Sequence, residues 1–392
     1  MQDKAKGISC AEIFDLIPVQ LVQNLEKKTK VNYQVKKLTG EIMLKLLLFS
    51  LLNSDRISLR IMAELCHSPQ FKILAQKDNL KTRHSTLSDR IANIDYRFFE
   101  KIFIALQEKF HSLRADSAIF SVAKYDSTLV RLSAKLLKFG MKREKSNRFL
   151  KFTIGLKGGL PQDAKLFQKQ SEISEEIALK ETILGSKYAK DSIVIFDRGL
   201  QSRQTFSLFT NNDILFITRA KSRLHYKQVR RYQKVKGVKT KTLILEKDLI
   251  VNLKNKSGRW LSPEFRLIIA RSKKSQEKLL FFTNVTHLDA ESITDIYKER
   301  WEMETFFKFL KQELNFKHLV SRTENGIKVM FYATLILAIL IIVYKKLNKI
   351  SSYKIAKIRF ANELEMEIVK YIVILCGGDI AKFFGPRNPY PI

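Results

Sequence analysis

Residues 329–344 read VMFYATLILAILIIVY, and nearly every side chain in this run is apolar or aromatic. A helix that is apolar on all faces is stable either across a lipid bilayer or inside a large protein core. A membrane span needs about 20 such residues, and this run is shorter and lies in a charge-rich chain. We therefore expect a helix buried in a sizeable core, with a membrane-surface protein as the alternative.

The charge of the chain is the second constraint. Lys and Arg total 71 against 39 Asp and Glu, which gives a net charge of +32 and a pI near 9.9. Because so positive a surface repels itself, an anionic partner is expected: nucleic acid first, an anionic membrane second. The length of 392 residues predicts two or three domains, at about 150 residues each.

Cysteine usage and the N-terminal sequence indicate a reducing cytoplasm. Cys10, Cys66 and Cys376 lie far apart and form no CxxC pair. This spacing argues against a disulfide framework and against a structural zinc site. The N-terminal residues lack the uninterrupted apolar segment of a signal peptide.

The first part of the chain has the pattern of a helical domain. Ser85 is a plausible N-cap for the segment STLSDRIANI. A helix-turn-helix arrangement would place Arg83 and Arg90 near the start of a helix that enters the major groove of DNA. An ordinary helical bundle with polar loops is the alternative.

From residue 117 the pattern changes to that of an α/β core. Apolar runs predict strands, and amphipathic segments predict the helices between them. Residues 221–286 hold short β-like runs separated by turn residues and predict an all-β insertion, after which helices return from residue 289. Strands are predicted in 117–132, 148–159, 191–199 and 213–220, and helices in 174–186 and 203–212.

Two aspartates directly follow apolar runs. Asp126 follows AIFSVAKY and Asp197 follows SIVIF, so we expect each at the carboxyl end of a buried strand. In open α/β sheets, sites gather at those ends. The alternative, and the commoner role for either aspartate alone, is a turn or helix-cap residue.

A helix predicted over 290–314 carries the third candidate group. Tyr297, Arg300, Glu304 and Lys311 fall within an arc of about 60° on an ideal helix. A carboxylate in such a stripe can bind a divalent cation, and the Arg and Lys side chains can bind phosphates. The alternative is a solvated helix face with an ordinary ion pair between neighbouring turns.

Together, Asp126, Asp197 and Glu304 make a set of three carboxylates that could hold two divalent ions for phosphoryl transfer. The sequence holds no GxSxG, HExxH or Walker A motif. Other hydrolytic chemistry and nucleotide-driven chemistry are therefore not indicated.

Three segments resemble a known family. YKERWEMETFFKFLK, with its Tyr-Arg-Glu-Lys spacing, resembles the signature helix of bacterial insertion-sequence DDE transposases of the insertion-sequence-four type. KYDSTLV resembles their first-Asp strand, and IVIFDRGL resembles the second. The resemblance covers roughly residues 120–345, and the N-terminal region matches only in being helical.

The resemblance implies an α/β fold: an RNase H-like catalytic core with an all-β insertion, a helical N-terminal domain and a helical C-terminal region. The insertion would lie between Asp197 and Glu304. The implied segments are a helical DNA-binding domain (1–112), the first part of the core (113–220), the insertion (221–286), the second part of the core (287–346) and a C-terminal region with a possible dimerisation role (347–392).

The resemblance also implies the chemistry. Asp126, Asp197 and Glu304 would bind two Mg²⁺ or Mn²⁺ ions, and water would nick a transposon end to leave a 3′ hydroxyl. That hydroxyl would form a hairpin with the opposite strand, and the reopened end would attack target DNA. Tyr297 and Arg300 would hold the phosphate near the terminal nucleotide, and Lys311 the backbone beside it.

Further contacts follow from the sharp bend of a hairpin. A base near the DNA end is expected to flip out onto an aromatic platform, for which Trp260 is the candidate. Its alternative is packing inside the β insertion. Arg198 would contact DNA or pair with a carboxylate, and Trp301, which points off the stripe, is expected in the core.

The implied partners are double-stranded DNA, as transposon-end inverted repeats and as target, and a second copy of the chain in a paired-end homodimer. No membrane is expected, and the implied location is the bacterial cytoplasm, associated with the nucleoid. The alternative function is a catalytically inactive, basic DNA-binding protein derived from a transposase.

Overall fold

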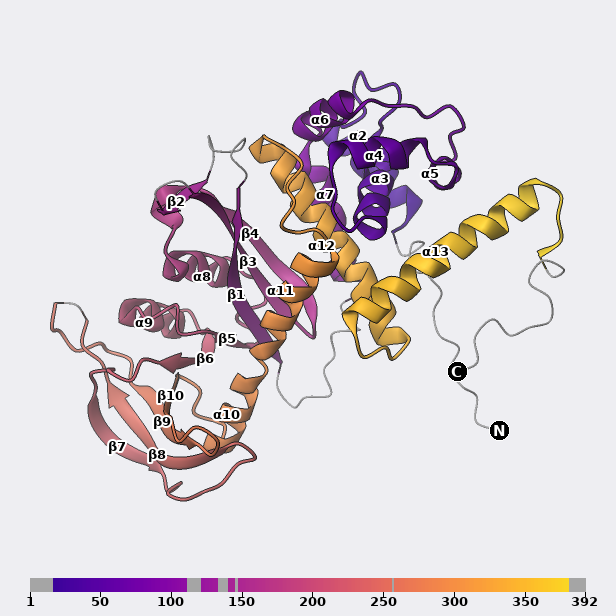
Figure 1. Ribbon diagram of the computed structural model, residues 1–392. Helices are drawn as coiled ribbons and strands as arrows, with labels where there is room; N and C mark the ends of the chain where they lie inside the picture. The colour runs from indigo at the N-terminus through magenta and orange to yellow at the C-terminus, as the bar shows by residue number, and fades with distance from the viewer. Residues whose placement is uncertain (1–16, 111–120, 133–139, 145–146, 256, 381–392) are drawn as a thin grey trace, which may run out of the picture. The chain divides into compact units, whose positions relative to one another are not determined.

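The computed structural model describes residues 17–110, 121–132, 140–144, 147–255 and 257–380. The chain divides into two compact units, drawn in Figure 1. One unit joins residues 1–111 to residues 308–392, and the other comprises residues 112–307. The expected segments are distributed over these two units, and the division falls inside a helix.

The first unit is helical in the part of the chain that the structure describes. Its elements are α2 (Val19–Thr29), α3 (Gly40–Asn53), α4 (Leu59–His67), α5 (Pro69–Ala75), α6 (His84–Asn93), α7 (Tyr96–Lys109), α12 (Glu324–Leu347) and α13 (Tyr353–Leu375). Capping side chains mark where several of these helices begin. The Thr39 side chain accepts a hydrogen bond from the Ile42 N–H at the start of α3, and the Thr323 side chain accepts one from the Gly326 N–H at the start of α12. Ser85 is not a cap, which corrects our expectation: α6 begins at His84, and Arg83 is its N-cap.

Helix α12 forms the centre of this unit. It is long and apolar enough to cross a membrane by length and composition, but 94% of its most apolar window is buried inside the protein. Helices α3, α6, α7 and α13 pack against it. The expectation of a core helix over 329–344 is therefore confirmed.

The second unit is built on one large sheet. β1 (Val122–Arg131) pairs antiparallel with β3 (Asn147–Lys157), which pairs antiparallel with β4 (Leu160–Phe167). On its other side β1 runs parallel to β5 (Ile193–Phe196), which runs parallel to β6 (Leu215–Ala220). An antiparallel meander followed by parallel strands is the order of an RNase H-like core, and the expected α/β fold is confirmed.

The strands of the insertion extend this same sheet. β10 (Lys278–Thr283) pairs antiparallel with β6, so the main strand order is β2-β3-β1-β5-β6-β10-β9-β8-β7, with β2 at Met141–Glu144 and with β4 pairing β3 off this path. Two of the short β-like runs within 221–286, TLILE and LIVNL, lie largely on the single strand β8 (Leu243–Asn252). Beyond β9 (Phe265–Ser272) and β8, the edge strand β7 (Lys227–Gln233) is almost entirely exposed.

Helices cover both faces of the sheet, as Figure 1 shows. α8 (Glu175–Leu184) and α9 (Arg203–Asn211) pack into one apolar cluster, and α10 (Ala290–Lys298) packs into the other. The helix expected over 290–314 is in fact two, α10 and α11 (Trp301–Glu313). The Arg300 N–H bonds to the Tyr297 carbonyl and the Met303 N–H to the Arg300 carbonyl, and these i to i+3 bonds tighten the chain between the helices.

A buried ion pair links the insertion to α10. The Arg266 guanidinium donates to both carboxylate oxygens of Asp248, at 2.9 and 2.7 Å, and neither side chain is exposed. The same guanidinium donates to the carbonyl oxygens of Val285 and Leu288. It therefore ties β8 and β9 to the segment that leads into α10.

We predict that Arg266→Met lowers the free energy of unfolding by about 3–5 kcal/mol, because it leaves the Asp248 charge buried without its partner. Arg230→Met removes a pair with Glu264 whose side chains are 58% and 39% exposed, and it should cost at most about 1 kcal/mol. Chemical denaturation of the two variants checks this. Equal losses of unfolding free energy in the two variants would show that the buried Arg266–Asp248 pair contributes no more to stability than the exposed pair.

Candidate active site

The register of two parallel strands brings Asp126 and Asp197 together. Tyr125 pairs with Phe196 at the end of the β1–β5 ladder, and the next residue on each strand is an aspartate. Because side chains alternate along a strand, both aspartates point to the same face. We expected Asp126 at the carboxyl end of its strand, but β1 continues to Arg131 because it stays paired with β3. Only the pairing with β5 ends here, at Tyr125, the residue before Asp126.

A third carboxylate, which the sequence analysis missed, joins them. Glu175 is the first residue of α8, and one carboxylate oxygen each of Asp126, Glu175 and Asp197 lies within 4.8 Å of the other two. A glutamate in the first turn of a helix is what the helix dipole favours anyway. The segment SEEIALKETILGS therefore indicated a helix start and carried no separate signal for a site.

Arg300 connects this group to Glu304. Its guanidinium lies 3.9 Å from Asp126 Oδ2 and 2.6 Å from Glu304 Oε1. The structure thus brings the predicted Asp126 and Asp197 together and places Glu304 on the other side of a guanidinium. Glu304 as the third metal ligand remains a prediction.

The electrostatics of the group favour a bound cation. Burial and then the neighbouring Asp197 charge raise the pKa of Asp126 from 3.8 to about 7, although Arg300 and a hydrogen bond from the Ser127 N–H act the other way. Carboxylate oxygens are the ligands that Mg²⁺ and related hard cations prefer. The donor set therefore fits a divalent cation.

Gly199 gives the carboxylates the space they occupy. Its N–H donates to Asp197 Oδ1 at 2.8 Å. A Cβ at this position would lie 2.7 Å from the Glu175 carboxyl carbon and 2.9 Å from Asp197 Oδ1. A larger residue would therefore push the two carboxylates apart.

A cleft of about 420 Å³ adjoins Arg300, and Arg219, Tyr297, Arg300 and Trp301 are among the residues that line it. Tyr297 is buried and packs edge-to-face on Phe281. Trp301 is 66% exposed, so its expected place in the core is wrong. The chain turns tightly just before Trp301, and angles taken along one continuous helix do not hold across that turn.

The other predicted contact residues lie on the surface of the second unit or in the first unit. Trp260 is 47% exposed, with the ammonium groups of Lys254 and Lys227 at 4.6 and 5.8 Å from its ring centre, so it does not pack a core. Arg198 is exposed in the turn after Asp197. Lys311 lies on α11, in the first unit.

Comparison with known proteins finds a family match over more than half of the chain. The family model for the transposase DDE domain matches residues 109–340. The match includes Asp126, Glu175, Asp197 and Glu304.

Individual relatives are similar at 22–28% identity. The chain is 26% identical over 149 residues to a protein named as a transposase for insertion sequence element IS5377 of Geobacillus stearothermophilus, 38% of each chain. It is 28% identical over 158 residues to the transposase y4zB of Sinorhizobium fredii, 40% of this chain and 44% of the relative. It is 22% identical over 292 residues to a transposase for IS4SA of Synechocystis, 74% and 79% of the two chains. The matched part thus spans less than half the length of the first two relatives.

A solved structure of a piggyBac transposase synaptic complex with hairpin DNA aligns with a TM-score of 0.47 and 10% identity, over 95% of this chain and 83% of that chain.

We predict that Mn²⁺ binding to the protein weakens about tenfold for each pH unit below 7, because the cation must displace the proton that Asp126 holds there. Calorimetric titrations above and below pH 7 measure this dependence. Asp126→Asn should abolish it, and Asp295→Asn, on the exposed face of α10, should leave it unchanged.

The same proton links pH to stability. Between about pH 4 and 7 the metal-free folded chain holds a proton that the unfolded chain has lost, so its stability should fall as the pH rises through that range. Asp126→Asn should flatten the fall. A wild-type stability that rises with pH over the same range would contradict the raised pKa.

Proposed function

Because this chain belongs to the family of transposases with a DDE domain, we propose that it cuts and rejoins the DNA of an insertion sequence by a cut-and-paste route through a hairpin. The observation that carries the proposal is the meeting of Asp126, Glu175 and Asp197 where the parallel β1–β5 pairing ends. Its substrates are double-stranded transposon ends and target DNA.

We assign Asp126, Asp197 and Glu304 as the catalytic carboxylates, with Glu175 as an additional ligand. They would hold two Mg²⁺ or Mn²⁺ ions. Divalent ions in such a site activate the attacking hydroxyl and stabilise the leaving oxygen of a phosphodiester. The protein contributes the geometry: two ligands come from neighbouring strands, one from the start of α8 and one from α11.

Arg300 and Tyr297 would bind the scissile phosphate. Arg300 bonds Glu304 and lies near Asp126, and a phosphate can offer two oxygens to the same guanidinium. Positive charge held by the carboxylates would remove the attraction of Asp126 for Arg300. The guanidinium would then be drawn to the DNA.

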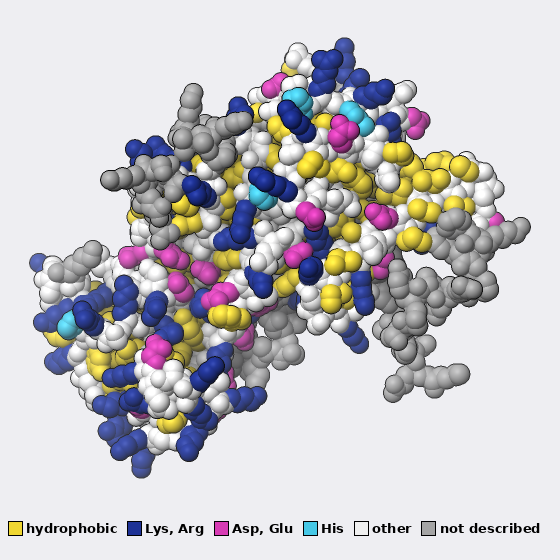
Figure 2. All heavy atoms as spheres, in the orientation of Figure 1, with side chains coloured by type: hydrophobic (Ala, Val, Ile, Leu, Met, Phe, Trp, Pro, Cys, Tyr) yellow, Lys and Arg dark blue, Asp and Glu magenta, His cyan; other side chains and the backbone are white. Residues whose placement is uncertain are grey.

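Trp260 and the edge of the sheet would bind the DNA beside the cut. Figure 2 shows Lys and Arg side chains gathered over the region that Figure 1 labels β7 and β8. Within this region Trp260 presents an exposed ring with Lys254 and Lys227 over it. Exposed aromatic rings among cations suit a flipped base and its phosphates. Arg198 and Lys311 would add backbone contacts.

Helix α6 is poorly suited to reading DNA. Arg90, expected near a groove-reading start, donates instead to the carbonyl oxygens of Leu38 and Val31 at 2.8 and 2.6 Å. It therefore holds the loop between α2 and α3.

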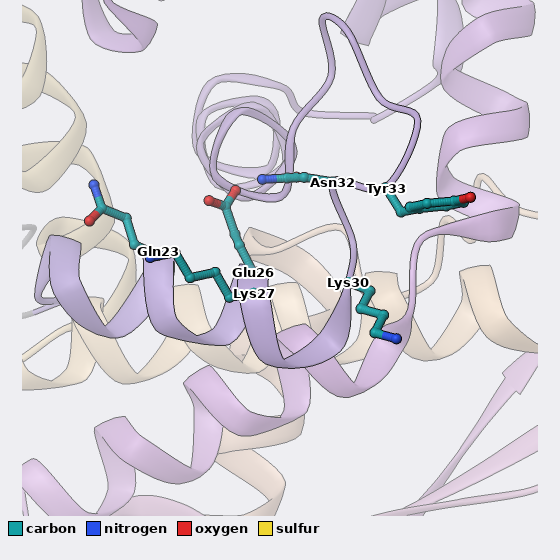
Figure 3. A pocket seen from close by; sticks show the side chains of 6 residues that line it. All are labelled: Gln23, Glu26, Lys27, Lys30, Asn32 and Tyr33. Atoms are coloured by element: carbon teal, nitrogen blue, oxygen red, sulfur yellow. The ribbon is translucent and has the colours of Figure 1, made fainter.

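That loop offers a better DNA surface. Figure 3 shows a hollow lined by Gln23, Glu26, Lys27, Lys30, Asn32 and Tyr33. Glu26 and Asn32 bind the backbone at the start of α3, whereas Tyr33 is 74% exposed and the lysines are exposed. With the exposed Lys28, Lys36 and Lys37, this forms a cationic surface with one aromatic ring, which we call the 27–37 surface.

A homodimer in the paired-end complex is part of the proposal. The distal half of α13 exposes an apolar side that suits a second copy. Its exposed residues include Met366, Tyr371, Ile372, Ile374 and Leu375.

We predict that Asp126→Asn and Asp197→Asn each reduce metal-dependent nicking of a transposon end by at least about a hundredfold, since even outer-shell partners of metal ligands contribute 10–100-fold. End binding should change less than about threefold. Gel assays with Mg²⁺ measure both, with Asp295→Asn as the matched control.

Nicking also separates the alternatives. Glu304→Gln and Glu175→Gln, compared in the same assay, show which glutamate is essential. A wild-type protein that binds ends but never nicks them would favour the inactive DNA-binding protein.

We predict that the triple variant Lys27→Gln, Lys30→Gln, Lys37→Gln weakens DNA binding and reduces the slope of log affinity against log salt by about 2.7, at about 0.9 per lost phosphate contact. The control triple Lys77→Gln, Lys317→Gln, Lys354→Gln removes equal charge from exposed positions of the same unit. Equal slopes for the two triples would remove the 27–37 surface from the DNA interface.

A further inference from the structure

A buried lysine lies two residues before Asp126. Lys124 is 4% exposed, and its ammonium bonds Glu299 at 2.8 Å and Glu302 at 2.7 Å. Burial alone would lower the pKa of Lys124, but Glu302 and Glu299 reverse that effect and the pKa is raised. The side chain therefore stays charged.

The two partners of Lys124 bracket the turn between α10 and α11. Glu299 follows the last residue of α10, and Glu302 is in the first turn of α11. Arg300 lies between them, and Glu304, like Glu302, is in the first turn of α11. The segment that Lys124 grips is thus the one that presents Arg300 and Glu304 to the carboxylate group.

Lys124 and Asp126 share a face of β1, because side chains two residues apart on a strand point the same way. The strand therefore contacts the turn twice: Lys124 bonds two glutamates, and Asp126 faces Arg300 at 3.9 Å. The two contacts have opposite charge patterns.

We propose that Lys124 is a positioning residue that holds the α10–α11 turn against β1, so that Arg300 and Glu304 stay in register with Asp126 when the carboxylates bind cations. The proposal rests on the proposed function for the identity of the site.

The opposite charge patterns give the reason. A cation among the carboxylates competes with Arg300 for Asp126 and weakens that contact. The contacts of Lys124 with Glu299 and Glu302 do not involve the metal ligands, so they persist. Lys124 is then the contact that keeps the turn in place during the reaction.

Trp301 supplies a readout that needs neither metal nor DNA. The chain has 2 tryptophans, so Trp260→Phe leaves Trp301 as the only one, between Arg300 and Glu302. In this background we expect Lys124→Met to increase the nanosecond amplitude of the Trp301 anisotropy decay about twofold, since the turn gains loop-like motion.

The controls distinguish the loss of the clamp, meaning the contacts of Lys124 with Glu299 and Glu302, from a general loss of positive charge. Lys298→Met removes a lysine whose ion pair with Asp295 lies on the surface of the same helix, and it should leave the Trp301 decay unchanged. Lys124→Arg keeps the charge and should restore most of the wild-type decay. Unchanged Trp301 motion in a folded Lys124→Met protein would overturn the proposal.

A second variant guards against misfolding of Lys124→Met. Glu299 and Glu302 are 42% and 32% exposed, so Glu299→Gln with Glu302→Gln weakens the same grip from its solvent side. This double variant should also increase the nanosecond amplitude of the Trp301 anisotropy decay. If Trp301 stays as rigid as in the wild type, the clamp is wrong.

The rate of DNA nicking tests the positioning role of Lys124 at the level of function. Lys124→Met should lower the nicking rate at saturating DNA at least about tenfold, while the Kd for DNA ends changes less than about threefold. Nicking at the wild-type rate would overturn the positioning role. If the wild type itself does not nick, the proposed function fails, and the Trp301 measurements still decide whether the clamp exists.

Discussion

The site depends on one constraint: the register of β1 and β5 holds like-charged carboxylates close together. Asp126 and Asp197 directly follow Tyr125 and Phe196, the last pair of the β1–β5 ladder, and Glu175 adds a third carboxylate within 4.8 Å. Without a cation, the protein limits the repulsion by keeping a proton near Asp126 and by placing Arg300 beside it. The arrangement costs stability above pH 7, and a divalent cation bound there would relieve that cost.

The acidic centre contrasts with the rest of a chain of net charge +32. Under the proposed function, the surfaces around Trp260 and the 27–37 surface would attract DNA phosphates, whereas bare carboxylates would repel them. Cations held by the carboxylates would reverse that local repulsion. The charge distribution would then let DNA bind broadly while making the approach of one phosphate to the centre dependent on metal.

Two buried basic side chains with different roles hold together the elements around the site. Arg266 ties the insertion strands to the segment entering α10, and Lys124 ties the end of α10 to β1. Because β10 pairs with β6, the insertion is continuous with the core sheet.

The sequence by itself determined the elements whose signals are local. The apolar run at 329–344 predicted a buried helix, and SIVIF and the apolar residues before Asp126 predicted strands, so Asp197 and Asp126 could be singled out. Glu175 could not, because an acidic residue at a helix start looks the same whether it caps a helix or binds a metal. Only the tertiary structure decided which face Trp301 and Trp260 present, and that Lys124 meets Glu299 and Glu302. Such contacts join residues far apart in the chain, and strand register and helix breaks, not local pattern, bring them together.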